Sequence, residues 1–348
     1  MSRRTDRPTP AQRPRHDMRI GLWGATSSGK TTYLGALKLA AEQARGRTRW
    51  KVTSKDPVAL SRLSELAHVL AVKRTFPEGT QHGTNTRLSW SFLGQKQTGP
   101  AGGGSQVEFA LDFLDVSGKL FEDQWTGGDE NEDGEDELDF DEVRGELDHV
   151  TGNEAAKEQL VEHLVACDGI IYLFDPVREE ENGNSFQYFN QVLDEVVSRT
   201  FDNGRLVGNR LPHQLAVCVT KFDDPRVLGR ATSRRELEAL AETPGQPKIR
   251  AGVAFRYFNM LCHERPDNSA QNIRDSIVSN FHRDRVSFHA TSSIGFYIGA
   301  NNRFDPADYA NIVSEHGQFR IRTRPQPMNV LEPLVRLVGR IRRTDTSR

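Results

Sequence analysis

The stretch GATSSGKT, from Gly24 to Thr31, follows the apolar run Met18–Trp23 and precedes a helical pattern over residues 31–44. Its spacing fits G-x-x-x-x-G-K-[ST], a loop between a strand and a helix that binds phosphate groups. The backbone N–H groups of such a loop and the N-terminus of the following helix attract negative charge. The stretch therefore predicts a phosphate-binding loop at the start of an α/β fold.

Each position of this loop has a chemical reason. Glycine at Gly24 and Gly29 lets the backbone turn inward around phosphate groups. The ammonium of Lys30 would neutralise the β- and γ-phosphates of a nucleotide, which makes it a candidate catalytic residue, and the Thr31 hydroxyl would bind Mg²⁺. The residues that we expect to contact the nucleotide here are Gly24, Ala25, Thr26, Ser27, Ser28, Gly29, Lys30, Thr31 and Thr32.

Strand patterns alternate with helical patterns along the rest of the chain, which is typical of a mostly parallel sheet. The candidate strands are residues 87–93, 107–116, 169–174, 214–220 and 286–290, and the candidate helices are residues 57–73, 154–166, 185–200 and 329–343. The first two strands flank the flexible stretch QKQTGPAGGGS, so we expect them to form an antiparallel hairpin. The sequence predicts a P-loop NTPase: a doubly wound, mostly parallel sheet with one antiparallel hairpin and helical insertions.

Two further motifs follow candidate strands. In LDFLDVSG, Asp115 ends an apolar run and Gly118 completes a D-x-x-G spacing. A carboxylate at the end of a strand is the second Mg²⁺ anchor of P-loop proteins. In TKFD, Asp223 can accept hydrogen bonds from both N1–H and the exocyclic amino group of guanine, an arrangement that adenine lacks.

In their order these motifs resemble those of Ras-like, TRAFAC-class GTPases, and the order of the candidate strands is similar too. The resemblance implies that Asp115 holds Mg²⁺ through water and that the Gly118 amide senses the γ-phosphate. A switch threonine should close onto Mg²⁺. Thr80, Thr84 and Thr86 all precede the hairpin, and we favour Thr80 because FPEGT forms a turn. The long connections are similar to those of bacterial GTPases of conflict or signalling systems.

The resemblance also assigns the residues that bind the base. Thr220, Lys221 and Asp223 stand where the family reads guanine, with the aliphatic stem of Lys221 over the base. The later stretch ATSSIG is similar to the loop whose backbone N–H meets guanine O6. Ser292 and Ser293 fall nearest that pattern.

The sequence departs from the family pattern after Gly118. Lys119 stands where Ras-like GTPases carry Gln and translation factors carry His to position the attacking water. A charged lysine stabilises charge but accepts no proton, so Lys119 is a candidate catalytic residue and we expect slow intrinsic hydrolysis. Ser293 and Ile294 replace the usual Ala and Lys. Arg74 is either an internal arginine finger or a solvated charge at a helix end.

The distribution of charge suggests how the chain is organised. The net charge is −2, yet residues 122–148 contain fourteen acidic side chains and one basic one. We expect residues 1–17 to form a disordered basic tail and residues 18–343 to form a single GTPase domain. Within that domain we expect an acidic loop insertion at 122–148 and a helical insertion at 225–284.

Composition also bears on location and partners. The sequence contains no apolar run of the ~18 residues that a membrane span needs, and its three cysteines form neither a disulfide framework nor a zinc pattern. We therefore expect a cytoplasmic protein with no transmembrane segment and no clear nucleic-acid site. GTP or GDP with Mg²⁺ are the expected cofactors, and the expected partner is a protein effector or activator, with the oligomeric state left open.

Two other functions fit parts of the sequence. Lys119 favours a nucleotide-gated binding scaffold that hydrolyses little GTP. The phosphate loop alone is compatible with a P-loop ATPase or kinase, but an ATP-dependent enzyme has no need of the carboxylate in TKFD. Guanine-nucleotide binding with Mg²⁺-dependent GTP hydrolysis, acting as a molecular switch, is therefore the leading interpretation.

Overall fold

The computed structural model describes residues 18–44, 48–78, 86–96, 106–115, 154–242, 244–264, 269–315 and 317–346. Several predictions fall on other parts of the chain. Thr80, Thr84, Gly118 and Lys119 lie outside the described residues, as do the tail 1–17 and the acidic segment 122–148.

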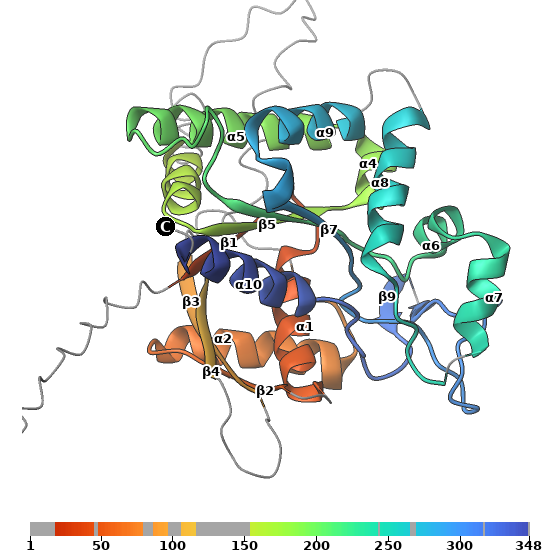
Figure 1. The fold of residues 1–348 in the computed structure, drawn as a ribbon. Coiled ribbons are helices and arrows are strands. Elements are labelled where there is room, and N and C mark those ends of the chain that lie inside the picture. Colours follow the sequence, from red (N-terminus) through yellow and green to blue (C-terminus); the bar gives the residue numbers. More distant parts are fainter. Residues whose placement is uncertain are drawn as a thin grey trace, which may run out of the picture.

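A seven-stranded sheet runs through the centre of the molecule in the order β2-β3-β4-β1-β5-β6-β7 (Figure 1). Its strands are β1 (Arg19–Gly24), β2 (Thr48–Thr53), β3 (Thr86–Lys96), β4 (Gln106–Asp115), β5 (Gly169–Phe174), β6 (Gln214–Val219) and β7 (Val286–Ala290). The pairs β4–β1, β1–β5, β5–β6 and β6–β7 are parallel. β3 and β4 form the predicted antiparallel hairpin, which is confirmed. β2 was not predicted, and it adds a second antiparallel pair at the sheet edge.

Helices cover both faces of this sheet, as expected of a doubly wound fold. The helices are α1 (Lys30–Gln43), α2 (Pro57–His68), the π-helix η1 (Val69–Lys73), residues 154–165, α4 (Pro176–Asn182), α5 (Ser185–Asp202), α6 (Pro225–Ala231), α7 (Arg234–Glu242), α8 (Ala251–Glu264), α9 (Ser269–Asn280), the 3₁₀ turn η3 (Arg283–Arg285) and α10 (Glu332–Thr346). In Figure 1, α5 and α9 lie on one side of the sheet, and α1, α2 and α10 lie on the other. A separate two-stranded ribbon, β8 (Ile312–Glu315) and β9 (Gln318–Ile321), precedes α10.

The central strands are apolar on both faces because each face meets a helical layer. Every residue of β5 and β6 is buried. In β5, Tyr172 and Phe174 belong to the core on the α5 side, whereas Ile171 and Leu173 belong to the core on the α1 side. Continuous apolar runs of this kind are typical of parallel strands between two layers of helices. The register of these strands is therefore fixed by burial on both faces.

The antiparallel part of the sheet is held to α2 by a buried tryptophan. Trp90 of β3 is 0% exposed, and its indole N–H donates a hydrogen bond of 2.8 Å to the Ala59 carbonyl. Asp56 caps the start of α2, because its side chain accepts a hydrogen bond of 2.9 Å from the Val58 N–H. Trp90 thus combines apolar burial with the hydrogen bond that fixes α2 against β3.

Replacing Trp90 by phenylalanine should lower the free energy of unfolding by about 1–3 kcal/mol, because the Ala59 carbonyl loses its buried donor. Urea unfolding followed by circular dichroism measures the loss. Trp50→Phe is the matched control, since Trp50 on β2 is only partly buried and should cost less. A Trp90→Phe loss equal to or smaller than that of Trp50→Phe would contradict this role.

Candidate functional site

The carboxyl ends of four parallel strands are aligned at one edge of the sheet. Gly24 at the end of β1 lies opposite Leu173 of β5. Phe174, the last residue of β5, lies opposite Val219, and Val219 lies opposite Ala290 at the end of β7. Three of the predicted motifs follow these strands directly, so GATSSGKT, TKFD and ATSSIG emerge together. In open α/β sheets this is the edge at which ligands bind.

The phosphate loop turns through two left-handed residues, Ser27 at φ 57° and Gly29 at φ 90°. Lys30 begins α1, and its ammonium donates hydrogen bonds of 2.9 Å to the carbonyls of Gly24 and Ala25. These contacts fold the lysine back over the start of the loop. The turn therefore presents the N-terminus of α1 and a cation on the same side.

Close packing explains why this loop begins with glycine. A Cβ atom at Gly24 would lie 2.6 Å from the Ser28 hydroxyl and 2.9 Å from the Leu173 carbonyl, too close for any side chain. The Ser28 hydroxyl is itself buried and has no hydrogen-bond partner. At Gly29 an added Cβ would meet nothing within 4 Å, so the loop is open there. The close packing at Gly24, the open space at Gly29 and the unpaired Ser28 hydroxyl are compatible with a loop that binds phosphate oxygens.

TKFD and ATSSIG form one connected structure. The N–H of Phe222 donates to the Thr291 carbonyl at 3.1 Å, and both the N–H and the hydroxyl of Thr291 donate to the Val219 carbonyl. Asp223 is 5% exposed and lies at the same sheet edge as Ser292. Burial raises the pKa of the Asp223 carboxyl to about 6, and the nearby Ser292 side chain opposes that shift.

The loop that carries Ser292 is fixed from its far side by the chain before α10. Ser292 and Met328 exchange two backbone hydrogen bonds of 3.0 and 2.8 Å. The Ser292 hydroxyl also accepts from the Gly295 N–H at 2.8 Å. Gly295 has φ 69°, and a Cβ there would lie 2.1 Å from the Gln326 carbonyl. Only glycine fits this turn, and Ser292 is held in place beside Asp223.

Thr220 has a structural task that the sequence did not indicate. Its N–H and its hydroxyl both donate to the Phe174 carbonyl, at 2.8 and 3.2 Å. This pair of bonds joins the start of TKFD to the end of β5. A threonine at this position therefore anchors the motif to the neighbouring strand.

Asp175 is a site residue that the sequence analysis missed. It follows Phe174 at the end of β5, and its side chain is only 1% exposed. One carboxylate oxygen forms an ion pair of 2.6 Å with the ammonium of Lys221 in TKFD. The signal that could have found it is Asp175 followed by Pro176, because Asp before Pro after a strand is typical of a helix start.

The described residues place the predicted metal ligands as follows. Thr31 lies in the first turn of α1 and is partly buried, as is Thr32. Asp115 is the last residue of β4, and in the hairpin register it lies opposite Thr86, the first residue of β3. Since β4 runs parallel beside β1, both hairpin residues lie at the edge of the sheet that carries the phosphate loop.

The guanidinium of Arg74 contacts the chain after β9. It has φ 54° at the end of η1, and its guanidinium donates to the Arg322 carbonyl at 3.2 Å. The Ile321 N–H returns a bond to the Arg74 carbonyl at 2.9 Å. Arg74 therefore connects η1 to the end of β9.

Within the described residues, no three or more His, Cys, Asp or Glu side chains gather in a group that could hold a metal ion. Mg²⁺ at a P-loop needs no such cluster, since it binds one or two protein oxygens together with phosphate and water. Thr31 and Asp115 are hard oxygen donors of that kind.

Among the described helices, none is long and apolar enough to cross a membrane.

The strand order, the hairpin beside β1 and the phosphate loop between β1 and α1 define the class of fold. The chain has a doubly wound, mostly parallel α/β fold with a phosphate-loop sequence between β1 and α1, the fold that the motifs predicted, and β2 and α2 lie between α1 and the hairpin.

No protein-family model matches the chain, and no curated protein is significantly similar to it. Solved structures give distant similarities to GTPases. One is Sup35 complexed with GDP, at 11% identity and a TM-score of 0.31, covering 87% of this chain and 43% of that chain. Another is the signal recognition particle receptor SRb-GTP/SRX complex from Chaetomium thermophilum, at 12% identity and a TM-score of 0.35, covering 82% of this chain and 94% of that chain. A third is the S. cerevisiae Ski7 GTPase-like domain bound to GTP, at 13% identity and a TM-score of 0.37, covering 93% of this chain and 50% of that chain.

Asp223→Asn should stabilise the free protein more at pH 8 than at pH 5. The folded-state pKa of about 6 exceeds the ordinary value of about 4, so the native state holds this proton more tightly. Stability from that proton is present below about pH 4 and is lost as the pH rises through about 6. Asparagine stays neutral, so the variant's advantage should grow with pH, to at most about 3 kcal/mol.

Urea unfolding of both proteins at the two pH values measures this difference. Asp224→Asn removes a carboxylate from the same loop and serves as the control, because Asp224 is paired with Arg226. Equal gains for Asp223→Asn at pH 5 and pH 8 would show that the burial of its charge is not the cause.

Proposed function

We propose that this chain binds GTP and GDP with Mg²⁺ and hydrolyses GTP, acting as a molecular switch. The observation that carries the proposal is the Asp223 carboxylate, buried beside Ser292 at the same sheet edge as the phosphate loop. A phosphate loop alone serves many nucleotides, whereas a carboxylate buried at the same sheet edge would be stabilised in its charged form by hydrogen-bond donors of the ligand.

Base selection follows from the hydrogen bonds that Asp223 has left to accept. Its carboxylate would take N1–H and the amino group of guanine, and these donors would offset the burial that raises its pKa. Adenine offers neither donor in that arrangement, so it would leave the buried charge unmatched. The Ser292 N–H already donates to the Met328 carbonyl, so we infer that Ser293 provides the N–H for guanine O6.

The phosphate groups would take over contacts that the loop now makes with itself. Lys30 would exchange the Gly24 and Ala25 carbonyls for β- and γ-phosphate oxygens. Thr31 and Asp115 would hold Mg²⁺, together with a switch threonine, for which Thr80 remains our choice. The metal would supply positive charge to the phosphates.

The switch itself would lie in segments outside the described residues. The Gly118 amide would bind the γ-phosphate and Lys119 would stabilise the charge that develops during its transfer. Loss of that phosphate would release both segments and change the affinity for an effector or activator protein. Because Lys119 replaces a residue that positions water, a scaffold with little hydrolysis remains the second candidate function.

Competition for a fluorescent GTP analogue, with Mg²⁺ present, tests base selection. GTP and GDP should displace it and ATP should not. Asp223→Asn should weaken GDP binding about 10- to 100-fold, because hydrogen bonds to charged groups contribute about 1.5–3 kcal/mol. Glu238→Gln removes an exposed carboxylate on α7 that is paired with Arg234, outside TKFD, and it should bind GDP like the wild type. Equal displacement by ATP would point to an ATPase or kinase.

Single-turnover release of phosphate from GTP tests hydrolysis. We expect a slow rate, on the order of 10⁻⁴ to 10⁻² s⁻¹, as for GTPases without an activator. The reaction should stop in EDTA and in Lys30→Ala. Turnover of about 1 s⁻¹ or faster would contradict the expected effect of Lys119, and no release above buffer would favour the scaffold.

A further inference from the structure

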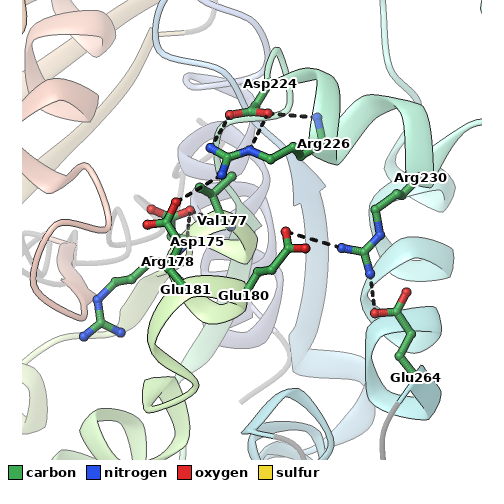
Figure 2. Close-up of polar contacts among 9 residues, drawn as sticks. All are labelled: Asp175, Val177, Arg178, Glu180, Glu181, Asp224, Arg226, Arg230 and Glu264. Carbon is green, nitrogen blue, oxygen red and sulfur yellow. Dashed lines mark hydrogen bonds and ion pairs between the residues drawn. The ribbon is translucent and has the colours of Figure 1, made fainter. Parts of the chain in front are cut away.

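The short helix α4 links the end of β5 to the base-reading loop. It runs from Pro176 to Asn182, and its cap is Asp175, which directly follows the last residue of β5. β5 lies beside β1, which carries the phosphate loop, and beside β6, which carries TKFD. Figure 2 shows α4 facing the start of α6, with charged side chains from both helices pointing toward one another. α4 is therefore placed to influence the loop between β6 and α6.

The two oxygens of Asp175 make different contacts. Oδ1 accepts from the N–H groups of Val177 and Arg178 at 3.0 and 3.2 Å, which caps α4 (Figure 2). Oδ2 lies 2.6 Å from the ammonium of Lys221. A carboxylate that is 1% exposed is costly without such partners, and the helix N-terminus and the lysine together offset that cost. The ion pair therefore joins Lys221 of TKFD to the start of α4.

Lys221 is the residue whose conformation the ion pair holds. It adopts φ 52°, a left-handed conformation that costs a non-glycine residue free energy. Its side chain is 42% exposed, so without Asp175 it would be free to sample other rotamers. Lys221 lies two residues before Asp223, so the backbone conformation of Lys221 affects the position of the Asp223 carboxylate.

The far end of α4 is tied to the same region. Arg226 of α6 binds both carboxylate oxygens of Asp224, at 3.2 and 3.0 Å, and also Glu181 of α4 at 3.0 Å (Figure 2). Arg230 pairs with Glu180 of α4 and with Glu264 of α8. These exposed pairs each contribute little, but they keep α6 in one position against α4. The loop from Lys221 to Asp224 is thus held at its start and at its end.

We propose that Asp175 is a positioning residue for guanine recognition. It acts through Lys221: the ion pair holds the left-handed turn that presents Asp223 to the base. The inference rests on the proposed function and deepens it, because it makes selectivity for guanine depend on a residue outside TKFD. In this role Asp175 would act without touching the nucleotide.

Asp175→Asn separates the two tasks of this side chain. The amide oxygen can still cap α4, whereas the charge that holds Lys221 is lost. GDP affinity should fall about tenfold while ADP affinity stays the same, so the ratio between them should fall tenfold as well. Lys221→Met keeps the aliphatic stem and removes the ammonium. The double variant should bind GDP no more weakly than Asp175→Asn alone, because the pair acts as a unit.

Displacement of a fluorescent GDP analogue by GDP and by ADP gives both affinities for the full chain. Asp56→Asn is the matched control: Asp56 also precedes a proline and caps a helix, but α2 lies away from TKFD. It should leave the ratio unchanged, and melting temperatures monitor folding of each variant.

Each outcome has a distinct meaning. An unchanged ratio in Asp175→Asn, or an equal loss of GDP and ADP binding, would overturn the positioning role. A wild type that does not prefer GDP over ADP would instead overturn the proposed function, and this inference with it.

Discussion

The alignment of four parallel strands is the constraint on which the site depends. β1, β5, β6 and β7 are hydrogen-bonded in one register, so their carboxyl ends reach the same edge. β5 and β6 are buried on both faces, and a shift of one residue would turn apolar side chains toward the wrong layer. Burial in two layers therefore fixes where the phosphate loop, TKFD and ATSSIG begin.

Two buried carboxylates at this edge illustrate two uses of the same chemistry. Asp175 has its partners within the chain, since α4 and Lys221 offset the cost of burial. At Asp223, burial raises the pKa, although the nearby Ser292 side chain opposes that shift. Keeping such a group ionised costs stability in the free protein, a cost that natural binding sites commonly carry. In our proposals, the first carboxylate positions the loop and the second binds the ligand.

Much of the fold could be predicted because its strongest signals are local. The candidate strands 169–174, 214–220 and 286–290 coincide with β5, β6 and β7, and the hairpin is β3–β4. β2 was missed although TRWKVT alternates as a half-exposed strand does; it is part of the sheet through its pairing with β3. α4 was missed because only its first residues are apolar, and its cap depends on Asp175.

What the sequence predicted by itself is the chemistry: a phosphate loop, a carboxylate placed to read guanine, and strands that alternate with helices. These signals depend on neighbouring residues, so spacing and periodicity reveal them. Only the tertiary structure decided that Thr220 bonds to β5, that Ser292 meets Asp223 and that Asp175 pairs with Lys221. Such contacts join residues far apart in the chain, and they exist because parallel pairing and burial on both faces bring separate strand ends to one edge.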